Sequence, residues 1–397
     1  MDKVILKPRR EESILRYHPW VFSGAIAQIV GNPSEGDMVG VYSADGQFLA
    51  SGHYQIGSIA VRILSFDEDP SRPDFWVLML SRALKLREAY GLAGSAETTC
   101  YRLVHGEGDG LPGLIVDYYD GVCVLQAHSV GMFRAKGAIC AALREVYGEG
   151  LKAVYDKSSG TAPFKAGLEL VDGYLWKADS FTADELTVLE NGNKFLVNWT
   201  QGQKTGFFLD QRENRARVGA LAAGRSVLNL FCYTGGFSIY ALAGGAVHVD
   251  SVDSSQRAMD MVDRNVALNG FTPDRHTSYC ADAIDFLRDI PEGKYDLIIV
   301  DPPAFAKHRG ALKNALRAYQ RLNAAAISKV APGGFVFTFS CSQVVDKEAF
   351  ALAVFSAAAE TGRSVRILDR LNQPADHSVN IYHPEGEYLK GLLLYVE

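Results

Sequence analysis

Residues 296–305 of the 397-residue chain, DLIIVDPPAF, indicate the fold most clearly. Residues 296–300 form a short apolar run bounded by turn-forming residues, which is typical of a buried parallel strand. Asp301 therefore follows the carboxyl end of a strand, where open α/β sheets bind their ligands. A second apolar strand, at residues 335–339, runs into FSCS and its lone cysteine, Cys341. A carboxylate and a thiol at two strand ends indicate one pocket, suited to covalent chemistry on a flat heterocycle.

The C-terminal half, residues 191–397, alternates strand-like and helix-like patterns. We expect strands at residues 226–231, 246–252, 296–300, 335–339 and 391–396, and helices at residues 236–243, 255–268 and 312–330. Repeated strand–helix units of this kind predict a doubly wound, mostly parallel α/β sheet.

The N-terminal half has two further patterns. Within residues 1–70, the segments GDMVGVYS, QFLASGHY and SIAVRILSF alternate apolar and polar positions, which predicts a small β-barrel or sandwich. A polar segment with two prolines, residues 67–73, is a candidate linker. Residues 75–190 then mix strands with helices near residues 75–90 and 132–147, which predicts a central α/β domain. The chain is long enough for two or three domains.

The charge of the chain is unevenly distributed. The net charge is −6, but residues 302–345 contain six Lys and Arg and no Asp or Glu, so this window carries +6. Four of these cations recur every fourth residue, which on a helix gives one basic stripe: Arg309, Lys313, Arg317 and Arg321. Such a stripe beside Asp301 would suit a polyanion. A solvated helix face would have the same pattern.

The cysteines and the N-terminal sequence indicate the cellular compartment in which the protein is expected. None of the six cysteines forms a Cys-x-x-Cys pair, so we expect no metal site. The chain start, MDKVILKPRR, lacks the features of a signal peptide, and no apolar run approaches the ~20 residues of a membrane helix. These features predict a cytoplasmic protein without a membrane partner.

The first strand–helix turn of the C-terminal half reads NLFCYTGGF, residues 229–237. Its two glycines allow a ligand close to the backbone, but their spacing is not that of dinucleotide sites. Asp253 follows the second strand and could bind ribose hydroxyls, and Asp282 follows the third and could reach an adenine amine. This ordered set suits S-adenosylmethionine. The predicted cofactor contacts are Phe231, Tyr233, Gly235, Asp253, Asp282 and Asp301.

Cys341 and Asp301 predict a route for methylating carbon 5 of a pyrimidine. A thiolate that adds to carbon 6 makes carbon 5 nucleophilic toward a methyl sulfonium, and Asp301 could hold ring nitrogen 3 or the exocyclic amine. The base would be flipped into the pocket, with Phe305 and Tyr319 as candidate stacking surfaces. Alternatively, Cys341 is a small apolar filler at a strand end. Cys232, inside the cofactor turn, is expected to be structural.

The chain resembles the RlmI-type large-subunit ribosomal RNA (cytosine-5) methyltransferases from end to end. The motifs that carry the resemblance are HPWVFSGAI (18–26), YRLVHGEGDGLPGL (101–114), TGFFLDQREN (205–214), LNLFCYTGGFS (228–238), VDSSQRAMD (252–260), DPPAF (301–305), FSCS (339–342) and ADHSVNIYHPEGEYLKG (375–391). The resemblance implies an N-terminal RNA-binding PUA domain, a central α/β domain and a Rossmann-type methyltransferase domain, at 1–70, 75–190 and 191–397. It implies S-adenosylmethionine as donor and a cytosine of ribosomal RNA as acceptor.

Carried over by motif, Asp253 and Asp282 correspond to ribose and adenine positions, Asp301 to the base-holding position and Cys341 to the nucleophile. His377 and its neighbour Asp376 are candidates for removing the proton from carbon 5. The remaining candidates for contacts with RNA are Pro302, Pro303, Phe305, Lys307, Arg309 and Lys313.

Rival interpretations stay open at this point. The same cofactor could methylate an exocyclic amine of adenine or guanine, which needs no cysteine. The chain could also be a ribosome-assembly factor that binds RNA without catalysis. A nicotinamide oxidoreductase is disfavoured because the dinucleotide fingerprint is absent. The oligomeric state, including a homo-oligomer, is left open.

Overall fold

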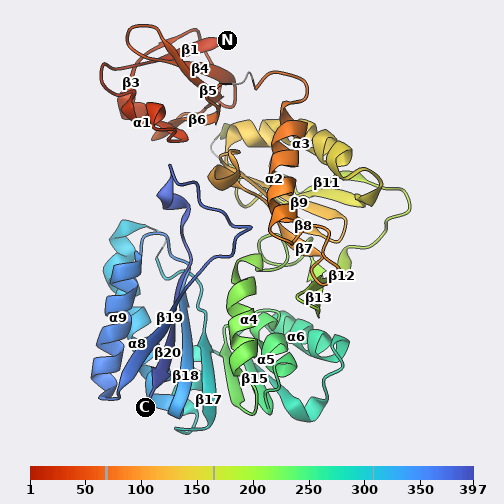
Figure 1. Cartoon of the computed structure of the whole chain (residues 1–397), viewed down its shortest axis with the longest axis vertical. Coiled ribbons are helices and arrows are strands. Elements are labelled where there is room, and N and C mark those ends of the chain that lie inside the picture. Colours follow the sequence, from red (N-terminus) through yellow and green to blue (C-terminus); the bar gives the residue numbers. More distant parts are fainter. Residues whose placement is uncertain (68–69, 164–165, 307) are drawn as a thin grey trace. The chain divides into compact units, whose positions relative to one another are not determined.

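The computed structural model describes residues 1–67, 70–163, 166–306 and 308–397. The described chain forms two compact units (Figure 1). Unit 1 comprises Met1–Val188, Val197–Leu209 and Ala375–Gly386, and unit 2 comprises Leu189–Leu196, Asp210–Pro374 and Glu387–Glu397.

Unit 1 begins with a six-stranded sheet in the order β2-β6-β5-β4-β1-β3. Its elements are β1 (Asp2–Leu6), α1 (Glu12–Leu15), β2 (Trp20–Phe22), β3 (Ile26–Val30), β4 (Met38–Tyr42), β5 (Phe48–Tyr54) and β6 (Ile59–Ser65). Its own core includes Val4, Val39, Val41 and Val61, all with no exposed surface. The small N-terminal β domain predicted from alternating hydrophobicity is therefore confirmed.

The second part of unit 1 is a five-stranded sheet in the order β11-β10-β9-β8-β7, against which two helices pack. Its elements are α2 (Phe75–Ala89), β7 (Cys100–His105), β8 (Leu114–Tyr119), β9 (Val122–Ala127), α3 (Val130–Tyr147), β10 (Ala153–Asp156) and β11 (Gly173–Lys177). The separate hairpin of β12 (Glu185–Glu190) and β13 (Asn193–Asn198) contributes its tip to unit 2.

Unit 2 is built on a seven-stranded sheet in the order β16-β15-β14-β17-β18-β20-β19. The strands are β14 (Ser226–Leu230), β15 (His248–Asp253), β16 (His276–Cys280), β17 (Tyr295–Val300), β18 (Val330–Ser340), β19 (Val365–Asn372) and β20 (Lys390–Val396). The first five run parallel, and β20 is antiparallel to both β18 and β19.

Helices cover both faces of this sheet (Figure 1). They are α4 (Arg212–Leu221), α5 (Gly236–Ala243), α6 (Gln256–Leu268), α7 (Ala283–Asp289), α8 (Leu312–Lys329) and α9 (Lys347–Thr361). Buried apolar side chains of α7, α8 and α9 share one core cluster with the sheet. The predicted doubly wound α/β fold is confirmed. Its strand order reverses between β14 and β17, and such reversal points are where open sheets bind ligands.

Candidate active site

The turn after β14 has an unusual backbone. Phe231 and Tyr233 adopt left-handed conformations with φ of 57° and 47°, and Gly235 follows with φ of 80°. Left-handed non-glycine residues are strained, and such strain concentrates at ligand-binding turns. A side chain at position 235 would also meet Val262 at 3.1 Å, so a glycine is required there for two reasons. The predicted cofactor turn therefore has a backbone specialised for close approach.

Asp253, at the end of β15, supports this turn. Its Oδ2 accepts a hydrogen bond from the Tyr233 backbone N–H at 3.0 Å, and its Oδ1 accepts one from Ser255 N–H at 3.0 Å. The carboxylate is partly exposed. Asp253 therefore lies beside the cofactor turn, as the sequence predicts, and also fixes the backbone of that turn.

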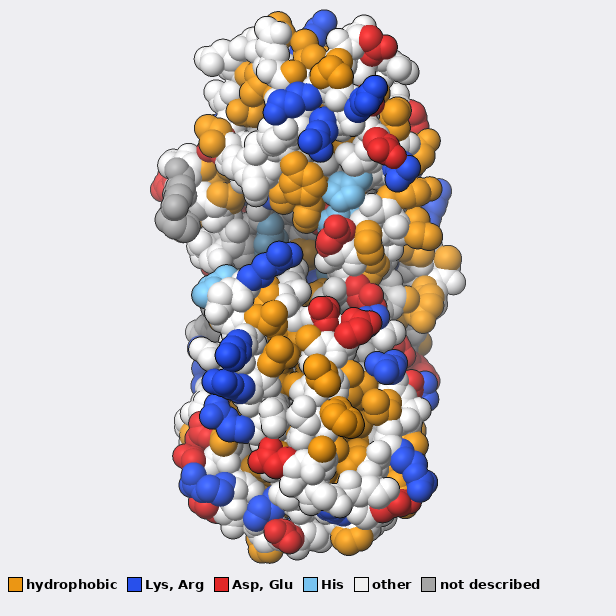
Figure 2. Space-filling view, turned by 90° about the vertical axis from the view of Figure 1, so that its left-hand side faces the viewer, with side chains coloured by type: hydrophobic (Ala, Val, Ile, Leu, Met, Phe, Trp, Pro, Cys, Tyr) orange, Lys and Arg blue, Asp and Glu red, His pale blue; other side chains and the backbone are white. Residues whose placement is uncertain are grey.

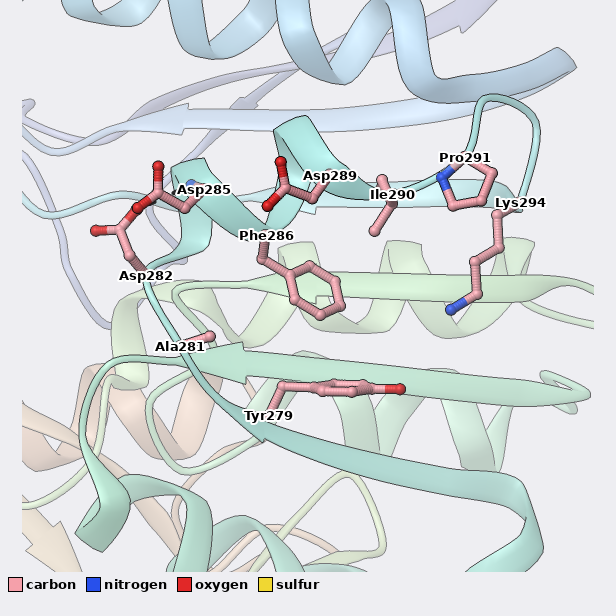
Figure 3. A pocket seen from close by; sticks show the side chains of 9 residues that line it. All are labelled: Tyr279, Ala281, Asp282, Asp285, Phe286, Asp289, Ile290, Pro291 and Lys294. Carbon is pink, nitrogen blue, oxygen red and sulfur yellow. Dashed lines mark hydrogen bonds between the residues drawn. The ribbon is translucent and has the colours of Figure 1, made fainter.

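Asp282 begins the next helix. Its Oδ1 caps α7 by accepting from the backbone N–H groups of Ile284 and Asp285 at 2.8 and 3.0 Å. Asp282 also lies at one end of an open pocket of about 440 Å³ between β16 and α7 (Figure 3). The rings of Tyr279 and Phe286, 4.8 Å apart, lie further along this pocket. Its far end is lined by Pro291 and Lys294, which both precede β17, so most of the pocket lies away from the carboxyl ends of the strands.

Asp301 follows β17 and is held by a polar relay that the sequence analysis missed. Gln211 Nε2 donates to Asp301 Oδ2 at 3.0 Å, and Asn214 Nδ2 donates to Gln211 Oε1 at 2.6 Å. Asn214 Nδ2 also donates to the Asn372 carbonyl at 3.2 Å. Gln211 and Asn214 are buried, so their hydrogen bonds fix the orientation of the Asp301 carboxylate. The polar run in TGFFLDQREN was the only signal for this relay.

Cys341 follows β18, the parallel neighbour of β17, so it lies at the same sheet edge as Asp301. The cysteine is partly exposed. Lys390, the first residue of β20, donates from Nζ to the carbonyls of Ser342 and Val345, both at 2.6 Å. Burial lowers the pKa of Lys390 to about 8, while the neighbouring Cys341 thiolate acts in the opposite direction. A buried cation therefore lies within electrostatic reach of the predicted nucleophile, and sequence reasoning did not find it.

Hydroxyl groups organise the turn around Cys341. Ser340 Oγ donates to Tyr319 Oη at 2.9 Å, and Tyr319 Oη shares a hydrogen bond with Ser342 Oγ at 3.2 Å. Tyr319 has no exposed surface, so the prediction that it stacks on a flipped base is wrong. Its position on the inner face of α8 makes it part of the core. Phe305 is partly exposed, and its ring lies 4.7 Å from that of Tyr319.

The basic stripe lies on the surface of unit 2. Its members in the described chain, Arg309, Lys313, Arg317 and Arg321, are all exposed. Figure 2 shows blue side chains in a column in the lower part of the view, on the face of α8 and α9. Lys307 lies outside the described residues. Among the nearby candidates, Pro302 is buried and Pro303 is exposed.

His377 lies in unit 1, whereas Cys341 lies in unit 2. Its side chain is 1% exposed, its Nδ1 lies 3.1 Å from Asp376 Oδ1, and its ring is 5.1 Å from that of His105. Asp376 in turn accepts from the Arg102 backbone N–H at 2.9 Å. The structure therefore places His377 in a buried polar cluster, and its role as a base stays a prediction.

Cys232 differs from Cys341 in its environment. It is buried, and the pKa of its thiol is raised well above the ordinary value, mainly by desolvation and further by the nearby Asp253 carboxylate. A thiol with a raised pKa is a poor nucleophile at neutral pH. This environment is consistent with the structural role expected for Cys232.

The comparisons with known proteins agree with this geometry. The S-adenosylmethionine-dependent methyltransferase family matches residues 175–393, and the PUA-like domain family matches residues 4–66. Among solved structures, that of SMU.776 complexed with SAH superposes with a TM-score of 0.85 over 100% of both chains at 24% identity. That likeness supports the fold. Fold and site thus define a Rossmann-type, S-adenosylmethionine-dependent methyltransferase.

Curated relatives narrow the class. A protein of Shewanella amazonensis named ribosomal RNA large subunit methyltransferase I is 41% identical over 395 residues, covering 98% of both chains. Its namesake from Pseudoalteromonas translucida is 41% identical over 398 residues, again covering 98% of both. The chain belongs to the ribosomal RNA large subunit methyltransferase I family. Among the described residues, none of the helices combines the length and hydropathy needed to span a bilayer.

Proposed function

We propose that this protein methylates carbon 5 of a cytosine in large-subunit ribosomal RNA through a covalent adduct with Cys341. The observation that carries the proposal is the sheet edge where Asp301 and Cys341 follow adjacent parallel strands, with buried Lys390 coupled to the thiol. The names of the relatives support ribosomal RNA as the acceptor.

The cofactor site is proposed at the switch point of the sheet. The left-handed turn of Phe231, Tyr233 and Gly235 would accept the ligand, Asp253 the ribose hydroxyls and Asp282 the adenine amine. Asp282 can serve because its cap uses Oδ1. When bound, S-adenosylmethionine supplies an electrophilic methyl group. Asp301, at the neighbouring strand end, would border both the donor and the base.

The chemistry assigned to the chain begins at Cys341. Its thiolate forms a bond to carbon 6 of the cytosine, and the electrons of the 5,6 double bond become available at carbon 5. Carbon 5 takes the methyl group, and S-adenosylhomocysteine leaves. A base then removes the proton from carbon 5, the double bond re-forms and the bond between sulfur and carbon 6 breaks. His377 is the candidate base from the sequence, and water is the alternative.

Asp301 and Lys390 would prepare this step. Asp301, held by Gln211, would accept a hydrogen bond from the exocyclic amine of the cytosine or from protonated nitrogen 3. Protonated Lys390 would stabilise the thiolate, because a cation near a thiol favours the ionised form. Both groups are buried or anchored, so they are oriented before the substrate arrives.

RNA binding is proposed for two regions of the chain. The exposed cations Arg309 and Lys313, continued by Arg317 and Arg321, would contact phosphates, with Lys307 as an additional candidate. The PUA-like domain, at residues 1–70, would add affinity for folded RNA. We infer that residues 75–190 form the central domain and residues 191–397 the catalytic one.

The experiment that tests this proposal supplies S-adenosylmethionine with a labelled methyl group and unmodified large-subunit ribosomal RNA. The methylated nucleoside is then identified by mass spectrometry. We expect label in 5-methylcytidine. Label in an adenine or guanine nucleoside would instead make Asp301-Pro302-Pro303 an amine-holding site and Cys341 a core residue. Binding of RNA without methyl transfer would favour an assembly factor.

A further inference from the structure

Two His-Pro dipeptides from opposite ends of the chain meet in unit 1. His18 precedes Pro19 and Trp20 near the N-terminus, and His383 precedes Pro384 and Glu385 in the 3₁₀ turn η8 (Pro384–Gly386). A ring nitrogen of His18, a ring nitrogen of His383 and a carboxylate oxygen of Glu385 all lie within 4.8 Å of one another. None of these residues has a role in the proposed methyl transfer.

His383 indicates that a ligand belongs here. It is 3% exposed, and within the described part of the chain neither of its ring nitrogens has a hydrogen-bond partner. Leaving a buried polar group without a hydrogen-bond partner destabilises a fold. An apolar side chain such as phenylalanine would fill the same space without leaving polar atoms unpaired. The unpaired ring nitrogens of His383 therefore indicate that one of them, through its lone pair, binds a ligand from outside the protein.

The ring of His18 is held by the backbone of Trp20. According to the tautomer, its Nδ1 either accepts a hydrogen bond from the Trp20 N–H at 3.2 Å or donates to the Trp20 carbonyl at 3.3 Å. In the tautomer with a proton on Nδ1, the ring donates to that carbonyl and leaves the Nε2 lone pair available. Histidines that bind metals commonly donate their second N–H to a backbone carbonyl in this way, which fixes the ring.

Glu385 supplies the negative charge. Its Oε2 lies 3.9 Å from His383 Nε2, and its side chain is 60% exposed. The rings behind the cluster are fixed by packing, since the Trp20 ring lies 4.2 Å from that of His383. Trp20 is held in turn by a hydrogen bond from its Nε1 to Glu107 Oε1 at 2.9 Å. The two imidazoles are therefore oriented by the fold, and the carboxylate can move to complete the set.

We propose that His18, His383 and Glu385 bind a divalent transition-metal ion of the zinc class, with the fourth position open to solvent. Two imidazoles and one carboxylate suit zinc, whereas calcium and magnesium prefer all-oxygen sites. Bonds of about 2.1 Å in a tetrahedron place donor atoms about 3.4 Å apart. The existing separations, up to 4.8 Å, require only small side-chain rotations.

A bound ion would link the N-terminal β domain to the segment Ala375–Gly386, which belongs to unit 1 although it lies near the C-terminus of the chain. The ion would therefore stabilise unit 1 rather than take part in methyl transfer. The expectation of no metal site rested on cysteine spacing, and the two histidines were missed because only the folded chain brings them together.

The test uses untagged full-length protein stripped with a chelator. Co²⁺ is titrated in, because its visible absorption reports nitrogen and oxygen ligands in four-coordinate geometry, and Zn²⁺ is then added as a competitor. We expect one ion per chain.

His383→Ala and Glu385→Gln should each weaken Zn²⁺ binding by at least about tenfold, which is the usual effect of removing a group that holds a metal ion in place. Since Glu385 is exposed, Glu385→Gln keeps the test valid if His383→Ala misfolds.

Matched controls are His308→Ala and Glu348→Gln, which remove exposed side chains outside the cluster and should bind like the parent. Zn²⁺ should also raise the melting temperature of the parent more than that of Glu385→Gln at the same Zn²⁺ concentration. The proposal is overturned if the parent binds no ion at micromolar Zn²⁺, or if His383→Ala and Glu385→Gln both bind as tightly as the parent. Neither result bears on methyl transfer, so this proposal and the proposed function can fail separately.

Discussion

The turns after β14 and β18 lie at the same edge of one sheet, and each contains a cysteine, but they surround the thiol differently. Cys232 is buried, and desolvation together with Asp253 raises the pKa of its thiol well above the ordinary value. Cys341 is partly exposed and electrostatically coupled to the buried ammonium of Lys390. A position at a strand end therefore gives a side chain access to the ligand crevice, whereas the charged groups around it determine its reactivity.

Removing each thiol in turn should have the largest effect and should separate the roles of the two cysteines. Cys341→Ala should lower methyl transfer by at least about 10³-fold, because loss of a nucleophile removes the covalent route. Its binding of S-adenosylmethionine, measured by calorimetry, should persist. Cys232→Ala is the matched control and should keep most of the activity. Equal losses in the two variants would contradict the assignment of roles.

Replacing the carboxylates at the ends of β17 and β15, Asp301 and Asp253, should change different kinetic parameters. Asp301→Asn should lower kcat by about 10²-fold, since a preorganised group facing the reacting base is weakened. Asp253→Asn should instead raise KM for S-adenosylmethionine by about tenfold, the effect of weakening hydrogen bonds to a charged acceptor. Steady-state kinetics with varied cofactor separates the two. A purely KM effect in Asp301→Asn would remove it from the chemical step.

Lys390 should make the rate of methyl transfer depend on pH. Because burial lowers the pKa of Lys390 to about 8, its positive charge is present below that pH and is lost as the pH rises through it. The rate should therefore fall above about pH 8 in the parent. Lys390→Gln should be about tenfold slower at neutral pH, the effect of losing one nearby charge. It should also lack the decline near pH 8.

Lys194→Gln is the control for Lys390, because Lys194 is an exposed cation of the same unit that does not contribute to the pKa shift of Lys390. It should keep the parental pH profile. A parental profile in Lys390→Gln would show that the decline has another origin, and the stabilising role of Lys390 would then be lost.

The smallest effect is expected at Tyr319, which supports the turn after β18 without contacting substrate. Tyr319→Phe removes the hydroxyl that bonds Ser340 and Ser342 and should lower the free energy of unfolding by about 1–2 kcal/mol. Urea denaturation measures this change, and kcat should stay close to the parental value. Loss of activity with unchanged stability would return Tyr319 to the list of base-stacking candidates.

The parallel strands of unit 2 were predictable because they are buried on both faces and appear as short apolar runs. Residues 226–231 and 296–300 correspond closely to β14 and β17, and the helix at residues 236–243 has the predicted bounds. The edge strand β19 was missed because its sequence, VRILDRLN, is exposed along much of its length and alternates with charges. Helix α4 was missed because its arginines are stabilised by tertiary partners, such as the ion pair of Arg215 with Glu190 at 2.7 Å.

Some residues of the candidate site could likewise be predicted from the sequence, and others could not. Asp301 and Cys341 could be predicted, since each directly follows a recognisable strand. Lys390 could not, because it reaches Cys341 only through the antiparallel pairing of β20 with β18, which places Lys390 opposite Ser340. Gln211 was hidden for the same reason, since its contact with Asp301 joins residues from distant parts of the sequence. Sequence patterns report strand ends, whereas the partners of those ends depend on the assembled sheet.

Trapping the covalent adduct would show directly whether Cys341 is the nucleophile. Large-subunit ribosomal RNA that contains 5-fluorocytosine carries no proton to remove at carbon 5, so the covalent intermediate should persist after methyl transfer. We predict a stable protein–RNA complex that requires S-adenosylmethionine, forms with Cys232→Ala and places the RNA adduct on the peptide containing Cys341. A complex that still forms with Cys341→Ala, or an adduct on another residue, would show that Cys341 is not the nucleophile.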